Sequence, residues 1–584
     1  MKRKLGRVQI VHLEINQPTR NYTMTKQKIT LLVLVLLCFG TIFYLFKDQL
    51  APPKEQRQVD NEALLAAYFE PVEPVLSSAL PTIEGVSTYR REMRDGKLVV
   101  KFPINIWGGW TPLIVANGGL RTTPDSIFGR KGLAVDLIIN DSSVDVMRGF
   151  ASGNFHVLWA TLDMVALYAP ALSVDSRTAP VVSQILDWSN GGDGVVARNG
   201  ITRINDLGTP STTGGKRRIV LAENSPSQFL MVSLLLTAGV DINSVEFVYA
   251  RDPIAAARLY VQNPDIDAFV GWAPQIYELP DLLPCSRLII TTSTANRWLA
   301  GVYAWRNDFF QDNRQIVTDI TDGLFEAMEV IRNPERHGTS TQNIWRLFAD
   351  TYGLDIADAE AMIGNDGMIF DTDAHLTNFR GNVNFFRGTG GANFATIWNR
   401  ANNVWLQLGV IQNPVAPERV KNTSILDALE HKWQNSIDLS QREFNPTSVR
   451  LLAESEAVGK RAVIAFRPNS IEVCAEFDPT VPETMTELSE MIAGFGYAMI
   501  VLEGHVDGSN RGIIPADDAR FLSEQRAEAV KRYLVANYDL QADQIRVIGK
   551  GWSNPLPGFP NMDDPEHRRM NRRVEIKIFT IESE

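Results

Sequence analysis

The stretch GHVDGSNRGIIPADDARFLSEQR, residues 504–526, constrains the fold of its part of the chain more than any other feature. It predicts a strand that ends in Asp507, a turn-rich loop, and a helix that presents Arg526 to the same side. A basic segment, RRMNRRVEI at residues 568–576, is expected to return beside it as a strand. A carboxylate takes an ammonium and a guanidinium grips a carboxylate with two parallel hydrogen bonds, so this pair could clamp a zwitterion.

This order of elements resembles the OmpA-like peptidoglycan-binding domain, whose pattern is a strand ending in GHTD, a loop, a helix beginning LSxxRA and a closing NRRVE strand. The nineteen positions between Asp507 and Arg526 resemble the longer loop of the flagellar-stator (MotB-like) branch of that family. The resemblance implies an α+β domain at residues 461–584 and, as its partner, a peptidoglycan stem peptide of the diaminopimelate type. The residues implied for this contact are Asp507, Arg526, Leu522, Ser523, Asn571 and Arg572.

The chain as a whole is too long for one core. A length of 584 residues predicts about three or four domains. The net charge of -11 argues against a nucleic-acid partner, because tracking phosphates requires a basic surface. The three cysteines, Cys38, Cys285 and Cys474, fall in different predicted domains, which excludes a disulfide framework and a thiolate metal site.

The N-terminus predicts a membrane anchor. Residues 1–28 form a basic tail, and residues 29–46 then run without a charge for about 27 Å as a helix, enough to cross a bilayer core. Excess positive charge before such a span places the N-terminus in the cytoplasm. Because the span ends in Phe43-Tyr44-Leu45-Phe46 and not in small residues, we expect it to be retained. The chain is therefore predicted to be a single-pass protein of the bacterial inner membrane, in contact with lipid through residues 29–46, with its bulk in the periplasm.

The predicted anchor also lacks a proton-carrying residue within the membrane. It contains no Asp, Glu or His, so it offers no intramembrane carboxylate for proton transfer. The proline-rich residues 47–97 that follow are predicted to be a periplasmic spacer.

Strands and helices alternate after the spacer. The predicted strands are residues 98–107, 132–140, 155–160, 217–222, 245–250 and 266–272. Such alternation predicts a mainly parallel sheet with helices on both faces, with ligands at the carboxyl ends of the strands. Residues 153–168 and 264–277 both read as turn, apolar strand, Trp and helix, which suggests two similar lobes.

Five motifs in this region together resemble periplasmic substrate-binding proteins that serve ABC importers of sulfonates, nitrate or thiamine precursors. They are WGGW (107–110), LWATLD (158–163), DWSNGGD (187–193), ENSPS (223–227) and VGWAP (270–274). The resemblance implies a two-lobed module at residues 98–410, with the second lobe at about 197–295, and a connector at 411–460.

The ligand cleft of that module is predicted to use Trp107, Gly108, Trp110, Thr161, Asp163, Asn190, Asp193, Ser225, Ser227 and Trp272. Ser225 and Ser227 begin a helix, where free N–H groups favour an anion. Asp163 and Asp193 would favour an amine, and the tryptophans offer flat walls for a ring or a cation. The residues leave the charge of the ligand open.

No catalytic motif accompanies these sites. The chain has no GxSxG, HExxH, P-loop or CxxC sequence, and its seven histidines are scattered. We expect no enzymatic activity, no cofactor and no metal. The predicted fold class is α/β: a two-lobed periplasmic-binding-protein fold, a C-terminal α+β OmpA-like domain and one N-terminal transmembrane helix.

Two functions fit this organisation. In the first, the chain binds peptidoglycan and holds a solute-binding-like module as a sensor or receptor at the wall. In the second, it is a scaffold subunit of a membrane or motor-like envelope complex, and the solute-binding fold docks other subunits without a ligand.

Overall fold

A computed structural model describes residues 66–583 apart from 78–79, 81–82, 212–213, 365–375, 389–390, 438–448, 452–455, 463, 465, 497 and 539. The described residues belong to one compact unit, Leu65–Glu584. The predicted basic tail (1–28), the predicted transmembrane helix (29–46) and residues 47–65 of the spacer lie outside the described residues. No helix within the described part has the length and apolar character needed to cross a membrane.

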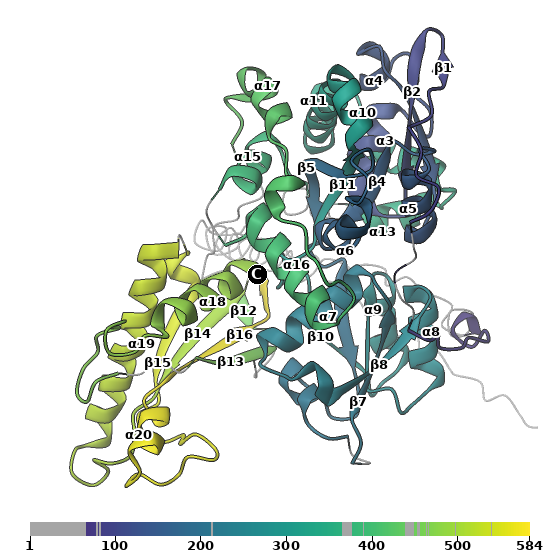
Figure 1. Cartoon of the computed structure of the whole chain (residues 1–584). Coiled ribbons are helices and arrows are strands. Elements are labelled where there is room, and N and C mark those ends of the chain that lie inside the picture. Colours follow the sequence, from purple (N-terminus) through teal and green to yellow (C-terminus); the bar gives the residue numbers. More distant parts are fainter. Residues whose placement is uncertain are drawn as a thin grey trace, which may run out of the picture. The chain divides into compact units, whose positions relative to one another are not determined.

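The first lobe is built on two three-stranded sheets (Figure 1). One has the order β1-β2-β3, made of Met93–Arg94, Lys97–Ile104 and Ala134–Ile139. The other has the order β4-β11-β5, made of Val157–Thr161, Ala300–Arg306 and Pro180–Trp188. The helices that follow or cover them are α3 (Thr111–Asn117), α4 (Ile127–Arg130), α5 (Ser143–Ala151), α6 (Leu162–Leu172), α10 (Asn307–Asp312), α11 (Arg314–Arg332), α12 (Thr341–Tyr352), α13 (Ile356–Ile363), α15 (Phe379–Arg387), α16 (Phe394–Gln407) and α17 (Ser424–Trp433).

The core of this lobe extends beyond residue 410. Ile425, Leu426 and Leu429 of α17 are buried in the same hydrophobic cluster as the first-lobe strands. Part of the segment predicted as a connector therefore packs in the first lobe.

The second lobe is a five-stranded sheet of order β10-β6-β9-β7-β8. Its strands are β6 (Asp193–Ala197), β7 (Arg217–Ala222), β8 (Val245–Ala250), β9 (Ala268–Trp272) and β10 (Arg287–Thr291), and its helices include α7 (Pro226–Thr237), α8 (Pro253–Gln262) and α9 (Gln275–Leu282). Two residues account for the start of α7. Ser225 caps its first turn by accepting a hydrogen bond from the Gln228 N–H, and Pro226 has no N–H that would need an acceptor at the first helical position.

The chain crosses between the lobes twice, from β5 to β6 and from β10 to β11. The two crossings are joined by backbone hydrogen bonds, 3.0 Å from Ser189 N to Leu299 O and 2.8 Å from Thr292 N to Asp193 O. All six predicted strands are present. The sheets are mixed and not mainly parallel, because β6 and β11, which the chain enters after a crossing, pair antiparallel with their neighbours.

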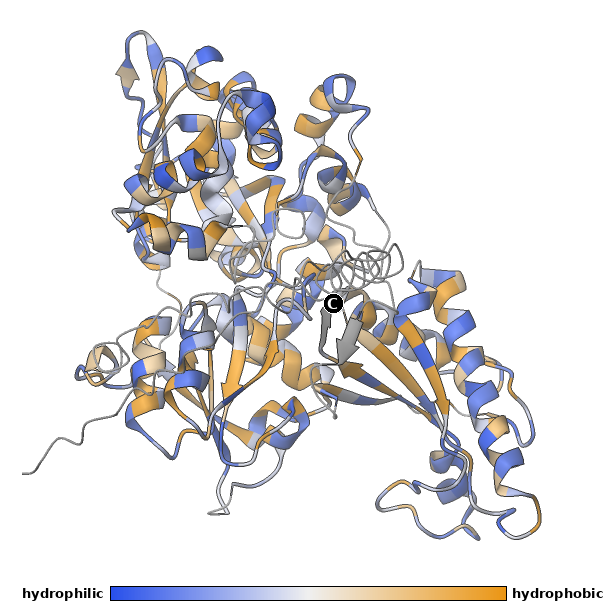
Figure 2. Cartoon of the chain, turned by 180° about the vertical axis from the view of Figure 1, so that it is seen from behind, coloured by the Kyte–Doolittle hydropathy of each residue, from blue (hydrophilic) through white to orange (hydrophobic). Residues whose placement is uncertain are grey.

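The C-terminal domain is a four-stranded sheet of order β13-β16-β14-β15 with helices packed against it. Its elements are β13 (Val458–Ala462), α18 (Val481–Gly494), β14 (Met499–Gly504), α19 (Ala516–Tyr538), β15 (Ile545–Gly549), α20 (Pro565–Asn571) and β16 (Val574–Phe579), and a separate pair joins β12 (Val449–Leu451) to β17 (Ile581–Ser583). Figure 2 shows the strands of the four-stranded sheet as mostly hydrophobic, whereas α19 carries hydrophobic and hydrophilic bands. The predicted α+β order of strand, loop, helix and closing strand is confirmed, but two bounds were wrong: β14 ends at Gly504, before Asp507, and the basic segment 568–576 begins inside α20 and becomes a strand only at Val574.

Gly504 explains how α19 reaches the end of β14. A Cβ at this position would collide with the backbone carbonyl of Ser523, so the helix and the strand can approach this closely only at a glycine.

We expect Gly504→Ala to destabilise the C-terminal domain by about 1–3 kcal/mol, since the helix backbone cannot yield as a side chain would. Urea unfolding of the full chain measures the loss. Gly215→Ala, at a position where an added Cβ meets only the Ser211 hydroxyl at 3.9 Å, is the control. Equal stability of the two variants would contradict the close packing.

Candidate binding sites

Asp507 follows the end of β14 and pairs with the basic segment before β16. Its Oδ2 lies 2.9 Å from Nη1 of Arg572, and its Oδ1 accepts hydrogen bonds from Ser509. Burial alone would raise the pKa of Asp507, but the hydrogen bonds from Ser509 and Arg572 hold it below its usual value. Asp507 is therefore ionised at neutral pH.

Arg526 lies on α19 and is only 1% exposed. Its Nε donates to the Ser470 carbonyl at 3.0 Å, its Nη2 to the Arg467 carbonyl at 3.4 Å, and its guanidinium carbon lies 5.1 Å from the centre of the Phe466 ring. Its Nη1 has no hydrogen-bond partner among the described residues. Burial, with the nearby Arg572, lowers the pKa of Arg526 to about 10, and Asp507 opposes that shift. The guanidinium thus remains charged, with one donor unused.

The other residues predicted for this site have mainly structural contacts. Ser523 accepts a hydrogen bond from the Gly551 N–H at 2.9 Å and so ties α19 to the end of β15. Asn571 accepts from the Leu556 N–H and donates to the carbonyls of Phe559 and His567, so it holds the loop before α20. Leu522 is half-buried. Asp507, Arg526 and Arg572 form the charged centre.

Beside this centre, Glu503, His505 and Glu575 come together with ligand atoms within 4.8 Å of one another. Glu503 already pairs with Lys550 and Lys577, each at 3.1 Å, and Glu575 with Arg573 at 2.8 Å. Burial lowers the pKa of His505 to about 4, so the imidazole is neutral. Three cations outnumber the two carboxylates, and we assign the cluster as an ion-pair network.

Three buried aspartates gather where the lobes join. Asp187, at the end of β5, is 3% exposed and accepts a hydrogen bond from Trp107 Nε1 at 2.9 Å. Asp193, at the start of β6, is 5% exposed and accepts from the Ser189 hydroxyl at 2.6 Å. Asp163, in the first turn of α6, is 1% exposed, and neither of its carboxylate oxygens has a hydrogen-bond partner among the described residues. We call these three residues the acidic junction.

Burial governs the ionisation of the acidic junction. It raises the pKa of Asp163 to about 7, of Asp187 to about 6 and of Asp193 to about 7. The negative charge of Asp193 adds to the rise at Asp163, and that of Asp187 adds to the rise at Asp193. The Thr161 hydroxyl moderates the rise at Asp163 but makes no well-formed hydrogen bond.

The remaining residues predicted for the cleft divide into two groups. Trp110 is core, because its indole N–H donates to Asn105 and its ring packs edge-on against Phe102. The Ser225 hydroxyl is used in capping α7. The second group lies near the junction or keeps an unused polar group, and its members are Trp107, Gly108, Thr161, Asn190, Ser227 and Trp272. Gly108 is buried, and Asn190 and Trp272 are half-buried. The fully buried Ser227 hydroxyl has no hydrogen-bond partner among the described residues.

Sequence reasoning missed Asp187 and Gly301 as members of this region. A Cβ at Gly301 would collide with the Asp187 carboxylate, so the glycine makes room for the acid. The available signal was a charged residue near the end of the otherwise uncharged run PVVSQILDW.

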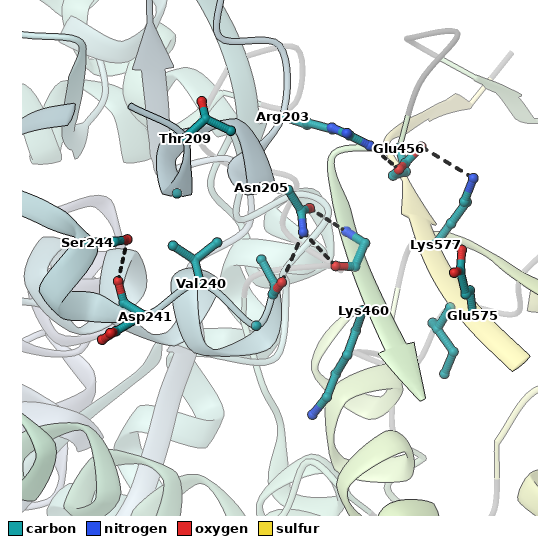
Figure 3. Close-up of a pocket in the computed structure, with 15 residues that line it drawn as sticks. Arg203, Asn205, Thr209, Val240, Asp241, Ser244, Glu456, Lys460, Glu575 and Lys577 are labelled. Atoms are coloured by element: carbon teal, nitrogen blue, oxygen red, sulfur yellow. Dashed lines mark hydrogen bonds and ion pairs between the residues drawn. The ribbon is translucent and has the colours of Figure 1, made fainter. Parts of the chain in front are cut away.

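A cavity of about 730 Å³ lies between the second lobe and the C-terminal sheet (Figure 3). Asn205 donates to the Gly459 carbonyl at 2.8 Å and accepts from the Gly459 N–H at 2.9 Å, so its amide continues the ladder of the edge strand β13. Arg203 Nη1 lies 2.5 Å from Glu456 Oε1, and Lys460 pairs with Glu487 at 3.0 Å. Because these charged side chains are engaged with protein partners, we assign the region as a contact between domains.

Residues 465–568 match the OmpA family. No curated protein matches the chain. Among solved structures, the periplasmic aliphatic sulphonate-binding protein SsuA of Escherichia coli is 13% identical and covers 55% of this chain and 97% of its own, with a TM-score of 0.41. The nitrate-binding protein NrtA of Synechocystis PCC 6803 is 11% identical and covers 58% of this chain and 89% of its own, with a TM-score of 0.42. SsuA of Xanthomonas axonopodis pv. citri, bound to MOPS, is 14% identical and covers 56% and 98%, with a TM-score of 0.39.

The raised pKa of Asp163 predicts how stability changes with pH. A carboxyl whose pKa rises on folding is protonated in the folded chain and ionised in the unfolded chain between about pH 4 and pH 7, so its contribution to stability falls as pH rises through that window. We expect Asp163→Asn to exceed the parent's free energy of unfolding by about 1–2 kcal/mol at pH 5 and by up to about 4 kcal/mol at pH 8.

Urea unfolding at the two pH values, followed by tryptophan fluorescence, measures this difference. Asp145→Asn, at a carboxylate whose side chain is 60% exposed, is the control and should show the same offset at both. A loss of stability in Asp163→Asn that is equal at pH 5 and pH 8 would show that the carboxylate has a structural partner.

Proposed function

We propose that this chain is an inner-membrane-anchored periplasmic protein that binds peptidoglycan through its C-terminal domain and holds a two-lobed solute-binding module at the cell wall. It acts as a ligand sensor or receptor without enzymatic activity. The partner at the wall is a stem peptide that carries diaminopimelate.

The buried, unused Nη1 of Arg526 is the observation that carries the wall-binding half. A buried charged donor without a partner is costly, and a ligand carboxylate placed there would remove that cost. Asp507 lies in the same charged centre and already contacts a cation, the Arg572 guanidinium. The free end of diaminopimelate carries an ammonium and a carboxylate on one carbon, so it can place the first against Asp507 and the second against Arg526.

The charge of this centre also favours a ligand that brings a carboxylate. Two guanidiniums, of Arg526 and Arg572, face the single carboxylate of Asp507. A zwitterion adds a negative group beside the unused donor and a positive group beside the acid, whereas a simple amine would add only positive charge.

The proposed location rests on the N-terminal sequence. The basic residues 1–28 and the uncharged residues 29–46 support a retained anchor with its N-terminus in the cytoplasm. The proline-rich spacer then supports a module carried away from the membrane. Two lobes joined by two crossings support a module that opens and closes on a small molecule.

We expect Asp507→Asn to weaken binding to the wall by roughly 10- to 100-fold, because a hydrogen-bonded charge contributes about 1.5–3 kcal/mol. Full-length protein in mild detergent, sedimented with purified sacculi over a range of concentrations, gives the affinity. Asp517→Asn, which removes an exposed carboxylate from the start of α19, is the matched control.

Competition tests the chemistry of the same contact. Free diaminopimelate should release the parent protein from sacculi at lower concentration than lysine does, since lysine has one ammonium–carboxylate centre and diaminopimelate has two. If Asp507→Asn sediments as well as the parent and Asp517→Asn, the assignment of the clamp is wrong.

A further inference from the structure

The acidic junction occupies one row of the first-lobe sheet and the crossing beside it. Gly301 of β11 lies between Thr161 of β4 and Asp187 of β5 in the strand register. Since Gly301 has no side chain, the Asp187 carboxylate lies over it. Asp163 follows Thr161 by two residues along the chain and lies in the first turn of α6.

The third acid comes from the crossing into the second lobe. Asp193 is held by Ser189, whose hydroxyl also lies 2.8 Å from the Thr292 hydroxyl of the return crossing. Trp107 closes the region from the side: its indole N–H binds Asp187 and its ring packs where a Cβ of Gly192 would be. Strand ends, both crossings and an aromatic wall therefore surround the acids.

Unused hydrogen-bonding groups point to something missing here. Both oxygens of Asp163 and the Thr161 hydroxyl are buried and have no hydrogen-bond partner in the part of the chain that the structure describes. From the second lobe, α7 brings the fully buried Ser227, whose hydroxyl also has none. Trp405 of α16 contacts both α6 and α7: its indole N–H donates to the Asp163 carbonyl of α6 at 2.8 Å, and its ring packs against Phe229 of α7.

The rest of the chain shows how it treats buried acids. Asp267 pairs with Arg217 at 2.8 Å, Asp322 with Lys432 at 2.7 Å, and Glu456 with Arg203 at 2.5 Å. Within the described part of the chain, no cation pairs with any member of the acidic junction. Buried carboxylates without a counter-charge are costly, so these acids hold protons unless a cation compensates them.

We propose that the acidic junction binds a small organic cation, an amine or ammonium compound, which supplies the missing positive charge between the lobes. The ammonium lies among the three carboxylates and donates to Asp163 and Thr161, with the Trp107 ring beside its alkyl part. Because the acids are at most 5% exposed, the ligand enters when the lobes separate and is enclosed when they close. This proposal names the ligand class of the solute-binding module and so rests on the proposed function.

Calorimetric titration of the full-length protein in mild detergent tests it, with 1,4-diaminobutane, ethanolamine and choline as cationic probes. Methanesulfonate and nitrate are the anionic probes, and sodium chloride at equal ionic strength is the blank. We expect at least one cationic probe to bind and both anionic probes to fail. Asp163→Asn and Asp193→Asn, which keep the side-chain shape, should each weaken that cation at least 10-fold, while Asp145→Asn on the surface should leave it unchanged.

Each other result overturns the proposal. Binding of an anion alone would refute the cationic ligand and leave the solute-binding function standing. Cation binding that survives both Asn variants would place it elsewhere on the protein. Binding of no probe would count against the junction as a ligand site and favour a docking role for the lobes. Sedimentation with sacculi is independent of all three results, so failure here is distinguishable from failure of the wall-binding function.

Discussion

Buried charge without a partner is the constraint on which this account depends. A folded chain pays heavily for such a charge unless another group compensates it, and most buried charges here are compensated within the chain. Among the buried charged groups that keep an unpaired atom in the described part of the chain, two bear on binding: Arg526 keeps Nη1 unused, and Asp163 keeps both carboxylate oxygens unused. The first lies in a domain that matches the OmpA family, and the second lies where the two lobes join. We interpret both as positions where a ligand completes the structure.

The two positions are complementary in sign. The C-terminal centre carries two guanidiniums and one carboxylate, so it lacks negative charge. The acidic junction carries three buried acids and no paired cation among the described residues, so it favours a ligand with positive charge. One chain therefore offers a site for a zwitterion with its carboxylate foremost and a site for a cation.

Asn205 and Arg203 attach the second lobe to β13 of the C-terminal sheet by side-chain contacts.

The sequence predicted the local elements of the fold better than their pairing. Six strands, a helix beginning at Ser225, and the strand, loop, helix and strand order at the C-terminus follow from periodicity and motif order. The strands β5, β6, β10 and β11 were not predicted. β5 is buried along its whole length and includes Ser183, Gln184 and Asp187, so it shows no alternation, and its role as a crossing depends on pairing with β11 more than a hundred residues later. Local pattern carries no information on such a partner.

The same limit applies to the sites. Asp507 and Arg526 could be assigned together because a motif fixes their spacing, but their burial and the involvement of Ser470 depend on tertiary packing. Asp163 and Asp193 were predicted as cleft residues, whereas Asp187 was not, since only the β4-β11-β5 register places it across Gly301 from Thr161. Trp110 was predicted in the cleft and lies in the core, because a tryptophan motif alone does not distinguish a ligand wall from a packed ring.

The most direct test of the central claim is a crystal structure of the protein grown with free diaminopimelate. The account predicts the ligand in the C-terminal domain, with its carboxylate within hydrogen-bond distance of Arg526 Nη1 and its ammonium against Asp507. A structure in which Arg526 Nη1 is satisfied by a protein carbonyl, and diaminopimelate is bound elsewhere or not at all, would contradict it.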